Sequence, residues 1–348
     1  MSTTVATGPA TVAGHTTDPN APLLEVKDLR VEFRMRHGTV VANDSVSYSL
    51  DAGETLAILG ESGSGKSVSA QAVMGIIDSP PGFIAGGSIR YRGVELLTMP
   101  EKDRRTIRAN HVAMIFQDAL TALNPVFSVG FQIAEMYRVH QGVSKKEATE
   151  KAIELLDRVK IPAARERINH YPHEFSGGMR QRVMIAMALA LNPAVLIADE
   201  PTTALDVTVQ AQVMQLLKEL QQDTGMGLIL ITHDLGVVAE VADRVSVMYA
   251  GRIVETGSIQ DIYNRPRHPY TLGLMESLPT MDSRGTRLEP IPGSPPDLQN
   301  RPSGCAFHPR CRMARPRCAS DDPPLLTIEG TGRSSACFYH EEVHLERG

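Results

Sequence analysis

Short apolar runs separated by polar turns dominate the chain and predict a sheet-rich core. From Leu23 to Leu59 apolar and polar residues alternate, which indicates an antiparallel layer, and Gly86 to Val94 is expected to add a strand to it. Other runs are apolar throughout, as is typical of buried parallel strands, and they cover residues 112–116, 195–198 and 228–231. Two closing strands are expected around Gly251, over residues 244–248 and 252–255.

Helical periodicity is concentrated between residues 118 and 172. From Lys145 to Val159 apolar residues recur on one helical face, namely Ala148, Ala152, Leu155, Leu156 and Val159. A second amphipathic helix is expected from Val207 to Asp223, with an inward face of Val213, Leu216, Leu217 and Leu220. This mixture of strands and helices predicts an α/β fold, and the lack of an internal repeat indicates one such unit.

The composition limits the classes of partner. The 348 residues are 42% hydrophobic, which is ample for a core, and the net charge of −5 gives little support for nucleic-acid binding. The longest apolar stretch, Val183 to Ala198, is broken by Asn192 and Pro193, so we expect no membrane span. Residues 1–22 are rich in Thr, Ala, Gly and Pro, and we expect this segment to be disordered and not to be a signal peptide.

A glycine-rich segment directly after the apolar run at residues 56–59 has the spacing of a phosphate-binding P-loop. Its glycines let successive backbone N–H groups converge on an anion, and the following helix directs the positive end of its dipole to the same point. Lys66 adds a mobile positive charge, and the Ser67 hydroxyl is placed to bind a Mg²⁺ ion that bridges the outer phosphates. The predicted nucleotide site comprises Gly60, Glu61, Ser62, Gly63, Ser64, Gly65, Lys66 and Ser67.

Polar residues follow three predicted buried strands and supply the chemistry of a nucleotide hydrolase. Asp199 is placed to hold Mg²⁺, and Glu200 to take a proton from the attacking water. Gln117 follows another strand and is placed to reach the metal and that water. His233 follows a third strand and is predicted to lie beside the γ-phosphate. Taken singly, Asp199 and Glu200 are also explained as a helix-capping acidic pair, and His233 as an ordinary strand-end histidine. Together, however, all three strands end in polar chemistry.

The segment from Phe175 to Arg182 resembles the signature sequence of the ATP-binding subunits of ABC transporters, Leu-Ser-Gly-Gly-Gln. This chain departs from that signature at its two ends, where Phe175 and Met179 stand. In the family the signature closes over ATP held by the P-loop of a second subunit, so the resemblance implies a dimer with two shared sites. It assigns this contact to Ser176, Gly177, Gly178 and Met179, and a dimer-contacting loop to Pro201 through Asp206.

The same resemblance implies a helical subdomain and a ring stacked on adenine. Residues from about 118 to 180 correspond to the subdomain that meets the transmembrane subunits. His37 occupies the position of the stacking ring, although it offers less area than Tyr or Trp. Phe33 is the alternative, but it alternates with Val31 in a predicted strand and is also explained as core. We favour His37.

All four cysteines lie in the proline-rich part of the chain beyond Pro266. They are Cys305, Cys311, Cys318 and Cys337. Disulfides are not expected in a cytosolic chain, so four clustered thiols without an obvious core suggest metal ligation, with an iron–sulfur cluster or zinc as candidates. The spacing matches neither the paired Cys-x2-Cys of zinc ribbons nor a standard ferredoxin run, and small buried hydrophobic residues remain the alternative.

Further motifs resemble the D-type ATPase of bacterial dipeptide and oligopeptide importers. They are residues 116–118 with 123–125, the signature ending in Met179, residues 268–271, and the cysteine motif at residues 304–311. This resemblance implies an ABC ATPase domain at residues 23–265 and a C-terminal extension at residues 266–348 with a 4Fe-4S cluster on its four cysteines. It also implies a peripheral subunit at the cytoplasmic face of the cell membrane. The implied partners are a second, F-type ATPase, two transmembrane permeases and an extracellular peptide-binding protein.

Other functions must be weighed against peptide import. Nickel importers share much of the ATPase pattern, and the cysteine-containing extension argues for peptides. ABC-type ATPases of translation or DNA repair act without a permease, but they carry tandem units or a long coiled-coil insert. A regulatory iron–sulfur sensor with a vestigial ATPase is disfavoured by the intact Lys66, Asp199, Glu200 and His233.

Overall fold

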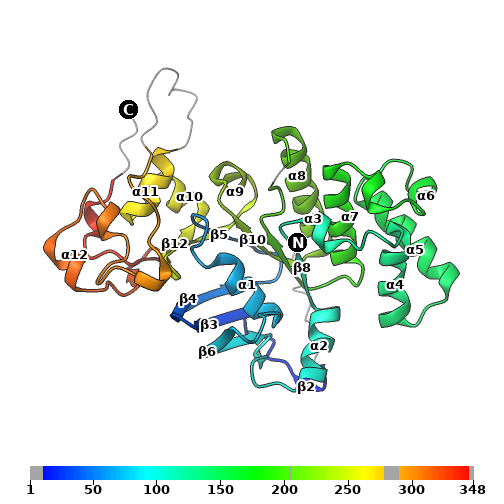
Figure 1. Ribbon diagram of the computed structural model, residues 1–348, viewed down its shortest axis with the longest axis horizontal. Coiled ribbons are helices and arrows are strands. Elements are labelled where there is room, and N and C mark those ends of the chain that lie inside the picture. Colours follow the sequence, from blue (N-terminus) through cyan, green and yellow to red (C-terminus); the bar gives the residue numbers. More distant parts are fainter. Residues whose placement is uncertain (1–10, 204, 278–289, 345–348) are drawn as a thin grey trace. The chain divides into compact units, whose positions relative to one another are not determined.

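The computed structural model describes residues 11–203, 205–277 and 290–344 (Figure 1). The chain forms two compact units, and each is built from several separate segments. The first unit contains residues 1–25, 49–54 and 89–229, and the second contains residues 26–48, 55–88 and 230–348. No helix among the described residues is long and apolar enough to cross a membrane.

The first unit contains a pair of parallel strands and the helices from α2 to α8. Its strands are β1 (Thr11–Val12), β2 (His15–Thr16), β7 (Val94–Glu95), β8 (Val112–Ile115) and β9 (Val195–Asp199). Its helices are α2 (Glu101–Asn110), α3 (Ala119–Ala122), α4 (Val129–Gln141), α5 (Lys145–Arg158), α6 (Ala164–Arg167), η1 (Pro172–Glu174), α7 (Gly177–Leu189) and α8 (Val207–Thr224). Strand β8 pairs in parallel with β9, with Val112 opposite Val195 and Ile115 opposite Ala198.

The helical part of this unit follows the predicted periodicity. Helix α5 begins after Ser144, whose side chain accepts a hydrogen bond from the Glu147 N–H, and its predicted apolar face is buried. The inward face predicted for α8 is also buried. Figure 1 shows α4, α5, α6 and α7 gathered as one green group, which is the predicted helical region.

The second unit contains the antiparallel layer, the strand before the P-loop and the C-terminal extension. It includes most of the residues of three strands, β3 (Leu24–Met35), β4 (Gly38–Leu50) and β6 (Gly82–Tyr91), and the end of β10 (Gly227–Thr232). It also includes β5 (Thr55–Leu59), α1 (Lys66–Met74), α9 (Leu235–Val241), β11 (Arg244–Tyr249) and β12 (Arg252–Ser258). Strands β4, β3 and β6 lie in that order, and β5 pairs in parallel with β11. The predicted strand at residues 86–94 ends earlier, because a turn at Arg92 and Gly93 separates β6 from β7.

The N-terminal segment departs from the expected disorder. Strands β1 and β2 form a short antiparallel hairpin in which Val12 is buried. The Asp18 N–H donates to the Arg92 carbonyl at 3.0 Å. The composition of this segment gives no indication of the buried valine or of the backbone pairing. Residues 1–10, to which the same expectation applied, lie outside the described residues.

The C-terminal extension is not the coreless tail that its prolines suggested. Helix α10 (Ile259–Asn264) precedes it. The extension contains α11 (Pro269–Glu276), η3 (Leu298–Asn300), η4 (His308–Arg310), α12 (Pro316–Ser320), β13 (Leu326–Ile328), β14 (Arg333–Ser335) and η5 (His340–Glu342). Strand β14 pairs with β12 and extends the sheet to the order β13-β14-β12-β11-β5. Phe307 is only 3% exposed, and its ring centroid lies 5.2 Å from that of Tyr249 and 5.4 Å from that of Tyr270.

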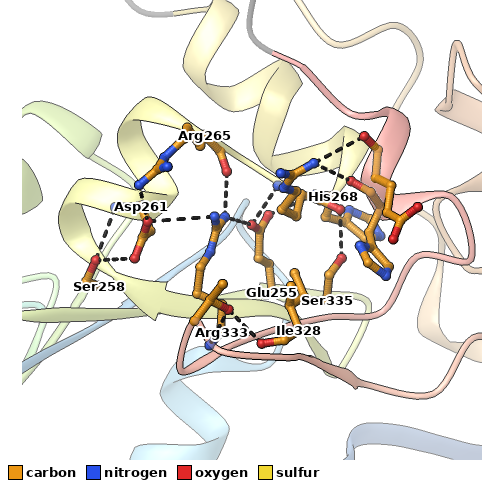
Figure 2. A network of polar contacts seen from close by, with 12 residues as sticks. Glu255, Ser258, Asp261, Arg265, His268, Ile328, Arg333 and Ser335 are labelled. Atoms are coloured by element: carbon orange, nitrogen blue, oxygen red, sulfur yellow. Dashed lines mark hydrogen bonds and ion pairs between the residues drawn. The ribbon is translucent and has the colours of Figure 1, made fainter.

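A buried polar network fastens the extension to β12 (Figure 2). The Glu255 carboxylate accepts hydrogen bonds from the backbone N–H groups of Arg267 and His268 at 2.7 and 2.9 Å. Arg333 in β14 adds a hydrogen bond to the same carboxylate at 3.1 Å and also donates to the Arg265 carbonyl. Burial raises the pKa of Glu255 to about 6, although Arg333 acts in the opposite direction. The charged form of the Glu255 carboxylate is therefore stabilised by these hydrogen-bond donors.

We expect Arg333→Met to destabilise the protein by about 3–5 kcal/mol, because it leaves the Glu255 carboxylate buried without its cation. Glu255 already has a raised pKa in the folded state, so its contribution to stability is present below its ordinary pKa and lost as the pH rises through about 6. The variant raises this pKa further, and its deficit should be larger at pH 8 than at pH 5.5. Urea unfolding at both values measures it.

The matched control for this prediction is Arg312→Met. Arg312 is half exposed and pairs with Glu276 at 2.9 Å, so its loss should cost about 1 kcal/mol or less. Equal deficits in the two variants, or a deficit in Arg333→Met that does not change with pH, would contradict the role given to the buried pair.

Candidate nucleotide site

The P-loop connects a buried strand to a helix, as predicted. All residues of β5 are buried, and α1 begins at Lys66 with Gly65 as its N-cap. The backbone N–H groups at the start of α1 therefore follow directly from the glycine-rich turn. This is the arrangement in which a helix N-terminus receives a phosphate.

Two glycines of the loop are required by close backbone contacts. Gly65 has φ +100°, and a Cβ added there would lie 2.4 Å from the Ala42 carbonyl oxygen. A Cβ added at Gly60 would lie 2.3 Å from the Met248 carbonyl oxygen. Asn43, which is fully buried, donates from Nδ2 to the Gly65 carbonyl at 3.0 Å. A larger residue at either glycine would displace the loop.

Two polar side chains inside the loop suit an anionic ligand. Lys66 is only 4% exposed, and its Nζ donates to the carbonyls of Gly60 and Glu61 at 2.7 and 2.9 Å. The Ser64 hydroxyl is buried and has no hydrogen-bond partner in the described part of the chain. Buried hydroxyl groups normally have partners, so Ser64 is a fitting contact for a bound phosphate. Of the other predicted loop residues, Ser62 and Gly63 are exposed, and Ser67 is half-buried.

The structure brings Gln117 and Glu200 together in the first unit. Asp199 ends β9 and is 5% exposed, and Glu200 follows with a left-handed backbone at φ +46°. The Gln117 side chain donates from Nε2 to Glu200 Oε2 at 3.1 Å. Thr203 Oγ1 donates to the same oxygen at 2.9 Å. Apart from its place three residues later in the chain, no sequence signal identifies Thr203 as a residue that orients Glu200.

His233 is exposed directly after β10, as predicted for a strand-end residue. The next residue, Asp234, has a structural role, because its carboxylate accepts from the N–H groups of Gly236 and Val237 and caps α9. His233 and the P-loop belong to the second unit, whereas Gln117, Asp199 and Glu200 belong to the first.

The signature segment begins helix α7. Ser176 is the N-cap, and its Oγ accepts from the Met179 N–H at 3.4 Å, while Gly177 is exposed. A Cβ added at Gly178 would lie 2.5 Å from Cγ1 of Val209 in α8, so this glycine permits close helix packing. Phe175, which replaces the signature leucine, is 2% exposed and therefore serves as a core residue. The departure at Phe175 leaves the helix start intact.

The structure does not test the roles that the resemblance assigns to Asp206 and His37. Asp206 is the N-cap of α8, and its Oδ1 accepts from the Val209 N–H at 3.0 Å. Ala204, in the same predicted dimer loop, lies outside the described residues. His37 lies exposed in the turn between β3 and β4, whereas Phe33 is half-buried. His37 is thus accessible to a ligand, and the adenine contact stays a prediction.

The four cysteines line one cavity of about 20 Å³, together with apolar residues that include Phe307 and Tyr339. All four are half-buried. Burial raises the pKa of Cys305 to about 11 and that of Cys337 to about 12, and the neighbouring thiols act in the same direction. No group of three or more Cys, His, Asp or Glu side chains among the described residues is arranged to hold a metal ion. The described side chains therefore show no preformed metal site at the four cysteines.

Sequence reasoning also missed a contact between the extension and the P-loop. The Arg310 guanidinium forms two hydrogen bonds with the carboxylate of Glu61, although the two residues are far apart in the chain. Both lie in the second unit. The cysteines of the motif at residues 304–311 predicted metal ligation, and nothing in the spacing of this motif indicates a contact with the P-loop.

The sequence matches two family profiles. The profile described as ABC transporter matches residues 43–203, and the one described as oligopeptide/dipeptide transporter, C-terminal region, matches residues 254–318. The chain is 52% identical over 322 residues to the oligopeptide transport ATP-binding protein OppD of Bacillus subtilis, covering 92% of this chain and 90% of the relative. It is 53% identical over 320 residues to OppD of Salmonella typhimurium, covering 92% and 94%.

A third relative and two solved structures agree with these matches. A putative peptide import ATP-binding protein of Brucella melitensis is 51% identical over 333 residues, covering 92% of this chain and 98% of the relative. The dimeric ATP-binding cassette MJ0796 bound to ADP and phosphate has a TM-score of 0.61 at 27% identity, covering 68% of this chain and 98% of the cassette. CbiO1 from Clostridium perfringens has a TM-score of 0.60 at 29% identity, covering 70% and 90%. The fold is that of an ABC ATPase cassette.

Proposed function

Since the chain belongs to the family of ABC transporter ATP-binding proteins, with the C-terminal region of the oligopeptide and dipeptide transporters, we propose that it hydrolyses ATP to drive peptide uptake. The observation that carries this proposal is the second profile match, at residues 254–318, because it lies beyond the residues that the ABC transporter profile matches. It favours peptide import over the related import of nickel or another small solute. The names of the relatives likewise favour transport over a soluble ABC ATPase without a permease.

In the proposed reaction, a water molecule attacks the γ-phosphorus of ATP, the bond to the ADP oxygen breaks, and Glu200 takes the proton of the water. The hydrogen bonds from Gln117 and Thr203 support this role, because they fix the carboxylate that must face the water. Lys66 and the P-loop backbone would bind the phosphates, and His233 would contact the γ-phosphate. Ser67, Gln117 and Asp199 would hold Mg²⁺, which neutralises phosphate charge when bound.

We expect Glu200→Gln to lower ATP turnover by about 10²–10⁴-fold and to preserve nucleotide binding, because the general base is lost and the phosphate loop is untouched. Lys66→Ala should instead weaken ATP binding. Steady-state hydrolysis and nucleotide affinity in the assembled transporter distinguish the two effects. Glu219→Gln is the matched control, since Glu219 is an exposed carboxylate on α8 that pairs with Lys160. Turnover by Glu200→Gln equal to that of the control would refute the assignment.

The proposed partners include a second ATP-binding subunit that completes the two ATP sites. This partner is another ABC cassette, and F-type is the wrong word for it, because a shared site needs a second P-loop and a second signature. Ser176 and Gly177 are exposed at the start of α7, which supports a contact with ATP held by another subunit. A cytoplasmic position at the membrane, where ATP is supplied, follows from the same proposal.

Two transmembrane permeases and an extracellular peptide-binding protein complete the proposed importer. Exposed apolar residues in the helical region support a permease contact, because such side chains gather at interaction surfaces. Val126 is 70% exposed, and the exposed rings of Phe127 and Phe131 stack with centroids 4.8 Å apart. These residues precede or begin α4.

We expect the isolated chain to hydrolyse ATP slowly and to gain activity when the second cassette and the permeases are added. Ser176→Arg should then suppress hydrolysis at the site whose P-loop belongs to the partner, because it adds bulk and charge at the start of α7. Glu200→Gln in this chain leaves active only the site with the partner's P-loop, and replacement of the partner's catalytic glutamate leaves active only the other site, so the effect of Ser176→Arg is measured at each site separately. Full activity of the isolated monomer would contradict the shared-site proposal.

For the cysteine cavity we propose a 4Fe-4S cluster held by Cys305, Cys311, Cys318 and Cys337. The gathering of all four thiols around one cavity supports this proposal, because four cysteine thiolates are the ligands that such a cluster takes. The cavity of about 20 Å³ is too small for the cluster without a displacement of these side chains. Zinc is the alternative metal.

We expect anaerobically purified protein to be brown and to contain iron and sulfide in equal amounts, because four thiolates bind such a cluster. Cys311→Ser or Cys318→Ser should lose this absorption, whereas Met313→Leu, which changes another residue of the cavity wall, should keep it. Visible spectra with iron and sulfide analysis provide the measurement. Colourless protein with one zinc per chain would exclude the iron–sulfur cluster, and four freely alkylated thiols would exclude both metals.

A further inference from the structure

Arg310 of the cysteine motif is buried against the P-loop. Its side chain is 6% exposed, and its two terminal nitrogens bond to the two carboxylate oxygens of Glu61 at 2.6 and 3.0 Å. Nη1 also lies 3.3 Å from the Tyr249 hydroxyl, and Nε donates to the Pro292 carbonyl at 2.9 Å. A two-bond pairing of this kind fixes the orientation of both side chains as well as their distance. Glu61 is thereby held by a residue of the extension.

The main chain of Glu61 is held by the extension as well. The Glu61 N–H donates to the hydroxyl of Tyr270 at 2.9 Å, and Tyr270 is fully buried in α11. Phe307 packs against the rings of Tyr249 and Tyr270. Phe307 and Arg310 both lie between Cys305 and Cys311, so this short segment supports both the aromatic cluster and the ion pair.

The position of Glu61 in turn sets the position of the P-loop lysine. The carbonyls of Gly60 and Glu61 receive the two hydrogen bonds from Lys66 Nζ. A shift of Glu61 would therefore move the acceptors of the ammonium group and the turn that precedes α1. This contact gives the extension a direct path to phosphate binding within one compact unit.

We propose that Arg310 is a positioning residue for ATP binding, and that it couples the segment from Cys305 to Cys311 to the P-loop. This inference rests on the ATP-binding function of the family. It adds that ATP binding depends on the segment from Cys305 to Cys311 as well as on the P-loop. By linkage, a change that displaces Phe307 and Arg310 weakens ATP binding, and bound nucleotide stabilises the segment by the same free energy. The state of the cysteines is thereby connected to nucleotide affinity.

The first test compares Arg310→Met with Arg310→Lys and with the control Arg312→Met. Arg310→Met should raise the Kd and the KM for ATP about tenfold and leave kcat at saturating ATP nearly unchanged, because a charge-assisted contact that positions the loop is lost. Arg310→Lys should give an intermediate effect, since an ammonium keeps the charge and loses the two-bond geometry. Arg312→Met should behave as wild type, because Arg312 pairs with the exposed Glu276.

A double variant separates positioning from loss of folding. If Arg310 acts through Glu61, adding Glu61→Gln to Arg310→Met should raise KM less than the sum of the two single effects predicts. Additive effects, or an Arg310→Met protein that is less stable and yet keeps the KM of wild type, would overturn the proposal. Loss of ATP binding in Arg312→Met or in wild type would contradict the nucleotide site itself and not the coupling.

Hydrogen exchange tests the reciprocal effect in the unaltered protein. Addition of ADP should slow amide exchange in residues 304–311 of the wild type, and this protection should be lost in Arg310→Met at saturating ADP. The wild-type measurement does not depend on the folding of any variant. Exchange in residues 304–311 that is the same with and without bound ADP would overturn the coupling.

Discussion

The backbone of the P-loop approaches two neighbouring strands so closely that no side chain fits at either end of the loop. The Met248 carbonyl of β11 faces Gly60, and the Ala42 carbonyl of β4 faces Gly65. Close packing holds the loop in place, because a shift of the loop at either glycine would leave a gap or bring backbone atoms into collision. Tyr249, which follows Met248, lies at the same end of β11 and contacts Arg310 and Phe307. The strand that shapes the loop therefore also anchors the extension.

Glu200, the proposed general base, has a strained backbone. Its φ of +46° is unusual for a residue with a side chain and costs about 1–3 kcal/mol. The Thr203 N–H donates to the Glu200 carbonyl at 3.2 Å, and the Thr203 hydroxyl donates to its carboxylate, so one residue holds both ends of Glu200. The turn after β9 is thereby fixed together with the carboxylate, and Gln117 completes its orientation from the end of β8.

Helices and strands that follow from local sequence patterns were predicted. Contacts between residues that only the tertiary fold brings together were not. Apolar runs located β5, β8, β9 and β10 because a buried strand needs uninterrupted apolar residues, and the polar residues after them were evident from position. The hairpin at residues 11–16 was missed, since its one buried residue, Val12, has no periodic pattern. Arg310 was missed because its partner Glu61 is distant in the chain, and no periodicity relates the two.

The prolines of the extension misled for a related reason. Proline predicts extended backbone, yet the motif at residues 268–271 uses Pro269 as the first residue of α11, where its missing N–H costs nothing. Burial lowers the pKa of His268 to about 3, so its ring is neutral and Nδ1 accepts the Tyr270 N–H at 3.1 Å. This cap fixes the start of the helix that carries the Tyr270 hydroxyl to the Glu61 N–H. A separate tail could vary without consequence for the P-loop, whereas this segment contacts Glu61 of that loop through both Tyr270 and Arg310.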